Sequence, residues 1–127
     1  MIMPEEQVPR RGEVYWIDLA DATGQATSKV RPCVVIQNDC DNRERAVTIV
    51  AAITSISTME SLPYAVRLKR GVAGLSGQPF VNCGHIYTVS KRHLQRRSGH
   101  LSSNEMCEVE KAIMYSLGIS AAERDQV

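Results

Sequence analysis

Two side chains, Arg31 and Thr54, have the types and positions expected for phosphate chemistry. Arg31 directly precedes a proline and the short apolar run at residues 33–36, so its backbone is rigid while its side chain can reach a neighbouring loop. A guanidinium in such a place can bind a phosphate through two hydrogen bonds. Thr54 ends the apolar run at residues 46–53 and offers a hydroxyl where the chain turns polar. Each residue alone is more commonly a surface arginine or a turn cap, and only the pair suggests a site.

Positive charge is concentrated in one part of the chain. The formal net charge is only +1, yet no Asp or Glu occurs between Glu60 and Glu105. Such a local field favours a polyanion such as nucleic acid, although a solvated basic face without a ligand gives the same pattern. The seven cations of this segment are Arg67, Lys69, Arg70, Lys91, Arg92, Arg96 and Arg97.

The length of 127 residues fits one domain. A hydrophobic fraction of 43% and a charged fraction of 23% are typical of a globular protein and argue against the disordered and membrane classes. The longest apolar run, residues 49–53, is far shorter than the about 18 residues of a membrane span. No secretory signal is visible at the N-terminus. We therefore expect a cytoplasmic protein without membrane association.

The four cysteines form no C-x-x-C pair and are expected to be reduced thiols. Cys83 and His85 have the chemistry of metal ligands, but no second pair with zinc-like spacing completes a site. We predict no metal and no cofactor.

Hydrophobic patterning predicts a small β fold. In residues 11–19, Val14 and Trp16 alternate with Tyr15 and Ile17, which is typical of a strand. Further strands are predicted at 33–36, 46–53 and 64–68, and residues 80–83 and 86–89 are predicted to form one or two more, with a bulge or kink at Gly84 between them. Residues 20–29 are predicted to form a surface loop and residues 38–42 a turn.

The C-terminal third predicts one amphipathic helix. Ser102 and Glu105 have the spacing of a capping box, and Gly118 stands where a helix commonly ends. Apolar residues recur at helical spacing, at Met106, Val109, Ile113 and Leu117. We therefore expect a mainly β fold with a C-terminal α-helix, an open barrel of about five strands, as a domain at 11–119 between tails at 1–10 and 120–127.

Four sequence blocks together resemble the signature of the MazF/PemK/Kid toxins. They are residues 11–16 (RGEVYW), 30–39 (VRPCVVIQND), 50–55 (VAAITS) and 88–94 (TVSKRHL), and the likeness extends to 117–119 (LGI). The resemblance implies an SH3-like open β-barrel of the MazF/CcdB type and a homodimer. It also implies the toxin component of a type II toxin-antitoxin system, inhibited by a MazE-like antitoxin through an acidic C-terminal segment.

The activity implied by this resemblance is that of a metal-independent, ribosome-independent endoribonuclease (mRNA interferase). Such an enzyme cuts single-stranded RNA at a short sequence by attack of the RNA's own 2′-hydroxyl, which leaves a 2′,3′-cyclic phosphate and a 5′-hydroxyl. Arg31 and Thr54 fall on the positions that the family uses for catalysis. We further predict RNA contacts by Gln25, Lys29, Ser55, Arg67, Lys69, Tyr87 and Lys91.

One block departs from the family pattern. Residues 85–91 read HIYTVSK where relatives commonly carry QIRTIDK, so Tyr87 and Ser90 replace an arginine and an aspartate. The change brings in His85, and an imidazole can transfer a proton near neutral pH. His85 is therefore a third catalytic candidate, against the alternative that it is structural.

Two other functions fit parts of the sequence. A CcdB-like gyrase poison shares the barrel, but such toxins end in Trp-Gly-Ile, whereas here residues 117–119 read LGI and Trp16 is the single tryptophan. A non-catalytic RNA-binding barrel would also explain the segment free of acidic residues.

Overall fold

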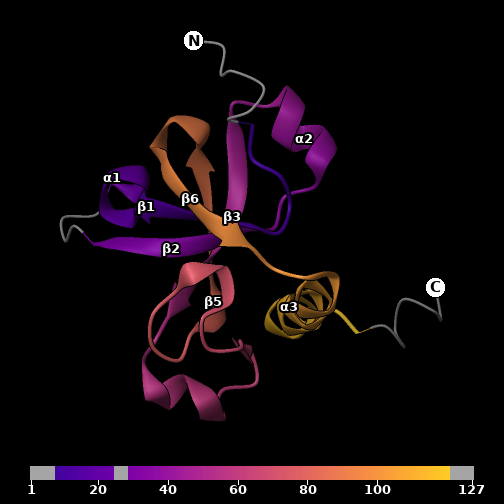
Figure 1. Cartoon of the computed structure of the whole chain (residues 1–127). Coiled ribbons are helices and arrows are strands. Elements are labelled where there is room, and N and C mark those ends of the chain that lie inside the picture. Colours follow the sequence, from indigo (N-terminus) through magenta and orange to yellow (C-terminus); the bar gives the residue numbers. More distant parts are fainter. Residues whose placement is uncertain (1–7, 25–28, 121–127) are drawn as a thin grey trace.

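In the computed structural model, which describes residues 8–24 and 29–120, one antiparallel six-stranded sheet organises the chain. The strand order is β4-β5-β3-β2-β1-β6, and the two edge strands do not pair, so the sheet is open. Helix α3 (Ser103–Ser116) lies against the sheet (Figure 1). The predicted mainly β fold with a C-terminal helix is confirmed. The strands are β1 (Glu13–Asp18), β2 (Val30–Val35), β3 (Val47–Thr54), β4 (Ala65–Arg67), β5 (Phe80–Ser90) and β6 (Leu94–His100).

Apolar side chains form one cluster on each face of the sheet. The α3-side core contains Val14 and Val34 with Val109 of the helix. The opposite core, called the α1-side core, contains Ile17 and Cys33. Successive residues of β1 thus enter opposite cores, as the alternation predicts. Strand β2 is buried on both faces, as its continuous apolar run also predicts.

Helix α3 begins and ends as the sequence predicts. The Ser102 hydroxyl accepts from the Glu105 amide at 3.1 Å, and the Glu105 carboxylate accepts from the Ser102 amide at 2.8 Å, which completes the capping box. Gly118 follows the helix in the left-handed region, with φ 72°. Leu117, the last apolar residue of the predicted helical pattern, is the cap residue at which the chain leaves the helical path, and it is 62% exposed.

Two predicted irregular segments contain short helices. Helix α1 (Leu19–Thr23) occupies the start of the predicted 20–29 loop, because the Asp18 side chain accepts hydrogen bonds from the first turn and Gly24 ends the helix at φ 77°. The loop residues 25–28 lie outside the described part of the chain. The predicted turn at 38–42 opens helix α2 (Asp39–Glu44), which is capped by the Asn38 side chain. Both corrections have the same cause, a polar cap that stabilises a helix too short to show apolar periodicity.

Strand β6 was not predicted, and residues 80–90 form the single strand β5, one of the two alternatives that the sequence left open. The β6 sequence LQRRSGH has a single strongly apolar residue, so it lacks the alternation of apolar and polar residues by which a strand is predicted, although it pairs with β1. In β5, Ala51 pairs with Ile86 while Ala52 pairs with Asn82, which leaves residues 83–85 as the predicted bulge. Glycine suits this position, because a Cβ atom would lie 2.7 Å from a ring carbon of Tyr64 and the ring would have to shift.

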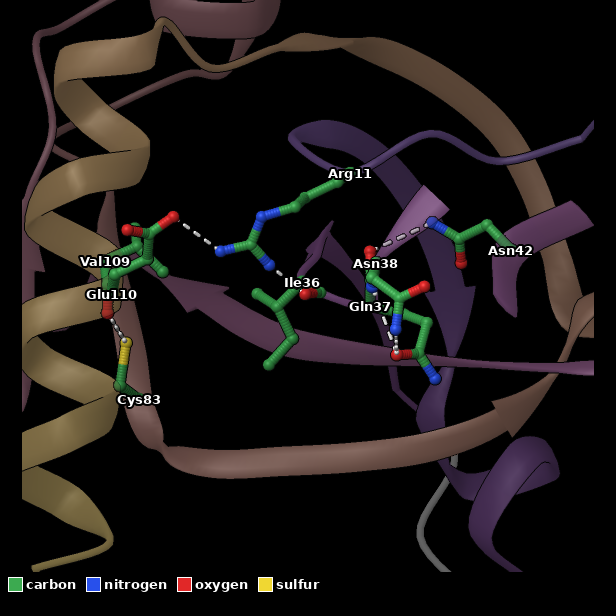
Figure 2. Close-up of polar contacts among 8 residues, drawn as sticks. All are labelled: Arg11, Ile36, Gln37, Asn38, Asn42, Cys83, Val109 and Glu110. Atoms are coloured by element: carbon green, nitrogen blue, oxygen red, sulfur yellow. Dashed lines mark hydrogen bonds and ion pairs between the residues drawn. The ribbon is translucent and has the colours of Figure 1, made fainter. Parts of the chain in front are cut away.

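Polar contacts join Arg11 to both α2 and α3, and its amide donates to the Asp39 carboxylate of α2 at 2.7 Å. Figure 2 shows the contacts of the Arg11 side chain and, separately, those of Asn42. The Arg11 side chain donates to the Ile36 carbonyl and, at 2.7 Å, to the Glu110 carboxylate of α3. The fully buried Asn42 amide donates to the Gln37 carbonyl at 3.0 Å and accepts from the Thr48 hydroxyl at 2.6 Å. Because both ends of this amide are paired, it holds α2 against β3 without an unmet polar group.

We predict that Asn42→Ala lowers the free energy of unfolding by about 2 to 3 kcal/mol, because the Thr48 hydroxyl and the Gln37 carbonyl lose a buried partner. Urea denaturation followed by circular dichroism measures the change. The matched control is Arg43→Ala on the exposed side of the same helix, expected within about 0.5 kcal/mol of the parent. Equal stabilities of the two variants would contradict a structural role for Asn42.

Candidate active site

The pairing of β2 with β3 brings Arg31 and Thr54 together. In the antiparallel register of these strands, Cys33 pairs with Ala52 and Val34 pairs with Ala51. When this register is continued by two residues, Arg31 stands opposite Thr54. Because alternate residues of a strand share a face, both positions fall on the face of the α1-side core, at the end of the sheet.

Arg31 and Thr54 line one shallow pocket of about 140 Å³. Trp16 and Leu75, which pack in the α3-side core, also line it, together with Ser55 and Ser76, so the pocket lies at the end of the sheet where residues of both faces meet. The full lining is Trp16, Val30, Arg31, Pro32, Ile53, Thr54, Ser55, Leu75, Ser76 and Pro79. The lining thus combines an arginine and three hydroxyl-bearing residues with apolar residues, a composition that suits the mixed charged and apolar character of a nucleotide.

The polar groups of this pocket are available to a ligand. Arg31 takes part in none of the ion pairs formed among the described residues. The Thr54 hydroxyl oxygen accepts from the Ile56 amide at 3.4 Å, a long contact that leaves the hydroxyl hydrogen for another acceptor. Both groups are half-buried, which strengthens their hydrogen bonds to a charged ligand relative to full exposure.

A thiolate at this site is disfavoured. Burial raises the pKa of the Cys33 thiol to about 12, and this effect outweighs the positive charge of Arg31, which lowers the pKa. Cys33 therefore remains protonated near neutral pH and packs as an apolar side chain in the α1-side core. The chemistry of the pocket rests on the guanidinium and the hydroxyls.

The other predicted RNA contacts are scattered over the molecule. Ser55 lines the pocket, and the exposed Lys29 directly precedes the lining residue Val30. Lys69 is exposed but is not among the described lining residues. Gln25 lies outside the described residues.

Arg67 and Lys91 also lie away from the lining of this pocket. Arg67 forms an ion pair with Glu60 at 2.8 Å and borders a different cavity of about 290 Å³ against α3. Burial lowers the pKa of Lys91, while the nearby Glu44 carboxylate opposes that shift. Part of the positive field expected from the sequence is thus neutralised by acidic residues outside the basic segment.

His85 and Tyr87 form a pair of their own on β5. The Tyr87 hydroxyl lies 3.4 Å from Nδ1 of the exposed His85, and the two rings meet edge to face with centroids 6.4 Å apart. Neither residue is among the described residues that line the Arg31 pocket. The structure therefore groups Arg31, Thr54 and Ser55, and it leaves His85 outside that group.

Sequence reasoning missed the part of the pocket supplied by residues 75–79. Leu75, Ser76 and Pro79 come from a segment in which Gly74 and Gly77 adopt positive φ angles of 71° and 70°. These glycines mark turns in the sequence, but nothing local indicates that the turns close over the end of β3. Trp16 was identified as a strand residue, without a signal that it reaches the site.

The described residues hold no group of three or more His, Cys, Asp or Glu side chains arranged to bind a metal ion. No helix in the described part of the chain is long and apolar enough to cross a membrane.

Residues 10–117 match the family model of the PemK-like, MazF-like toxins of type II toxin-antitoxin systems. The chain belongs to this family. The match spans the sheet, the Arg31 pocket and the whole of α3, so the family assignment rests on nearly all of the described fold.

Solved structures agree with the family assignment. An endoribonuclease in complex with its cognate antitoxin from a mycobacterial species shares 25% identity with a TM-score of 0.74, covering 88% of this chain and 97% of that one. A MazE-MazF structure from Deinococcus radiodurans shares 24% identity with a TM-score of 0.71, covering 89% and 99%. A MazF toxin of Mycobacterium tuberculosis shares 20% identity with a TM-score of 0.72, covering 85% and 98%. The last two likenesses concern the fold alone.

Proposed function

We propose that this toxin is an endoribonuclease that cuts single-stranded RNA at the pocket formed by Arg31 and Thr54. The observation that carries the proposal is the placement, in the lining of one pocket, of the half-buried Thr54 and of the half-buried Arg31, whose guanidinium forms no ion pair with the described residues. Family membership supports it, as does the similarity to a mycobacterial protein that is itself named an endoribonuclease.

In the proposed reaction, the 2′-hydroxyl oxygen of the RNA attacks the adjacent phosphorus, and the bond from phosphorus to the 5′-oxygen breaks. The proton of the 2′-hydroxyl passes to a base, and the departing 5′-oxygen receives a proton from an acid. The products are a 2′,3′-cyclic phosphate and a 5′-hydroxyl. Arg31 binds the phosphoryl oxygens as negative charge gathers on them, and the Thr54 hydroxyl donates a hydrogen bond to one of them.

This reaction requires no metal ion, because the nucleophile belongs to the substrate and a guanidinium can stabilise the phosphoryl charge. We propose that Ser55 and Lys29 help to hold the RNA at the pocket, since one lines it and the other adjoins it. His85 is proposed as a proton-transfer group on the ground of its exposed imidazole and its contact with the Tyr87 hydroxyl.

We predict that Arg31→Ala and Thr54→Ala each reduce cleavage by about a hundredfold, because one preorganised donor to the phosphoryl group contributes about 3 kcal/mol in the transition state. The assay incubates purified protein with a long single-stranded RNA in excess EDTA and measures the appearance of 5′-hydroxyl ends. Matched controls are Arg43→Ala and Thr58→Ala, which remove the same groups from exposed positions outside the pocket lining.

Near parental cleavage by a folded Arg31→Ala protein would disprove the proposed site. Binding of the RNA without cleavage by the parent would favour the non-catalytic barrel. Cleavage that disappears in EDTA and returns with a divalent cation would contradict the metal-independent reaction.

For His85, we predict that His85→Gln lowers the cleavage rate and removes an inflection near neutral pH from the rate profile, because glutamine cannot exchange a proton in that range. The measurement is the initial rate as a function of pH at saturating RNA. Tyr87→Phe is the companion variant, which removes the hydroxyl contact and keeps the imidazole. A profile unchanged by His85→Gln would show that His85 is structural.

We further propose that the toxin is a homodimer inhibited by a partner protein whose acidic C-terminal segment covers the RNA pocket. A positively charged pocket that attracts phosphate also attracts carboxylates, and a disordered segment can become ordered on binding. One solved relative is described as a complex with its cognate antitoxin.

The regulatory proposal predicts a dimeric mass and loss of cleavage on titration with the product of the adjacent gene, measured by light scattering and by the RNA assay. The same partner with the carboxylates of its C-terminal segment changed to amides is expected to inhibit less strongly. A monomer that remains fully active at saturating partner would overturn the regulatory proposal, while the nuclease assignment would stand.

A further inference from the structure

An arginine from the edge strand β6 lies over a tryptophan of the Arg31 pocket. The guanidinium carbon of Arg96 is 5.7 Å from the centre of the Trp16 ring. Trp16 lines the same pocket as Arg31 and Thr54. This contact therefore adds a second cation, carried by a different strand, at the border of the candidate active site.

The two adjacent arginines of β6 have different environments. Arg97 forms an ion pair with the buried Glu13 carboxylate at 2.6 Å, so its charge stabilises the junction of β1 and β6. Arg96 is exposed and takes part in none of the ion pairs formed among the described residues. The aromatic face of Trp16 is the group that holds the Arg96 guanidinium in place.

A guanidinium held by an aromatic ring remains free to bind an anion at its edges. Stacking uses the planar face, whereas the N–H donors point outward in the plane. The indole Nε1 of Trp16 is also buried without an acceptor among the described residues. This N–H is shielded from solvent, so the anion-binding donors that this border offers are those of Arg96.

We propose that Trp16 and Arg96 form a subsite for a phosphate of the RNA that flanks the scissile phosphate. Arg96 binds this flanking phosphate directly, Trp16 acts as the positioning residue that holds the guanidinium, and neither takes part in the bond changes. The subsite rests on the proposed nuclease function, because the pocket of Arg31 and Thr54 defines where the scissile phosphate lies.

The test compares Arg96→Gln with Arg92→Gln, which removes the same charge from an exposed position in the nearby turn Lys91–His93. Cleavage of a long single-stranded RNA gives kcat and KM. We expect Arg96→Gln to raise KM about tenfold, the effect of one charged hydrogen bond, with kcat nearly unchanged. Arg92→Gln is expected to stay within about twofold of the parent.

A second measurement reports the phosphate contact directly. A fluorescently labelled 2′-O-methyl RNA pool cannot be cut, because its 2′-oxygens are blocked, and its affinity is measured over a range of salt concentrations. Loss of one phosphate contact reduces the slope of log affinity against log salt by about 0.7. We expect this reduction for Arg96→Gln and not for Arg92→Gln. The Arg96→Lys variant, which keeps the charge, is expected to retain the parental slope.

Emission from Trp16, the single tryptophan of the chain, reports the same event. We expect the 2′-O-methyl RNA pool to change this emission in the parent and to change it less in Arg96→Gln. If Arg96→Gln fails to fold, a reduced salt slope in Arg96→Lys would by itself overturn the subsite.

The outcomes separate the subsite from the nuclease function. Parental cleavage with identical KM and salt slopes for Arg96→Gln and Arg92→Gln would overturn the subsite and leave the nuclease intact. A fall in kcat with an unchanged KM and slope would also overturn it, because Arg96 would then not bind a flanking phosphate. Absence of both cleavage and RNA binding in the parent would overturn the proposed function and the subsite together.

Discussion

The register between β2 and β3 is the constraint on which the candidate site depends. Cys33, Val34 and Val35 are all fully buried, so β2 has apolar side chains committed to both faces of the sheet. A shift of one residue in this pairing would exchange the faces of every side chain in the strand. The same register that satisfies two cores therefore also fixes Arg31 beside Thr54. The position of the site is a consequence of core packing, and no contact between the two polar residues is needed to establish it.

The elements that could be predicted from the sequence are those with a characteristic local pattern of apolar and capping residues. Alternation indicated β1, a continuous apolar run indicated β2, and a capping box with a terminal glycine indicated α3. Strand β6 was missed because an edge strand held by backbone hydrogen bonds to one neighbour requires no apolar face. The short helices α1 and α2 were missed because single polar caps stabilise them.

Arg31 and Thr54 could be singled out because each stands at the end of an apolar run. The rest of the site could not, since Trp16, Leu75 and Ser76 come from segments far apart in sequence and meet only through the tertiary fold. The distribution of charge around the site could likewise be predicted only in part. A segment without acidic residues suggests seven available cations, yet Arg67 and Arg97 are paired with Glu60 and Glu13, which lie outside that segment. Composition gives the charge of a segment, and the fold decides how much of it faces a ligand.

The polarity of β6 has a further consequence, for association between copies of the chain. An open sheet ends in two strands with unpaired backbone groups, and such edges can join to edges of other molecules and form aggregates. Here one edge, β4, is only three residues long. The other, β6, carries adjacent arginines and little apolar surface, so a second β6 brought alongside it would meet repulsion between like charges. The polar sequence of β6, which is the reason the strand was not predicted, thus opposes aggregation through this edge. Apolar replacements in this strand would favour precipitation even where the native fold tolerates them.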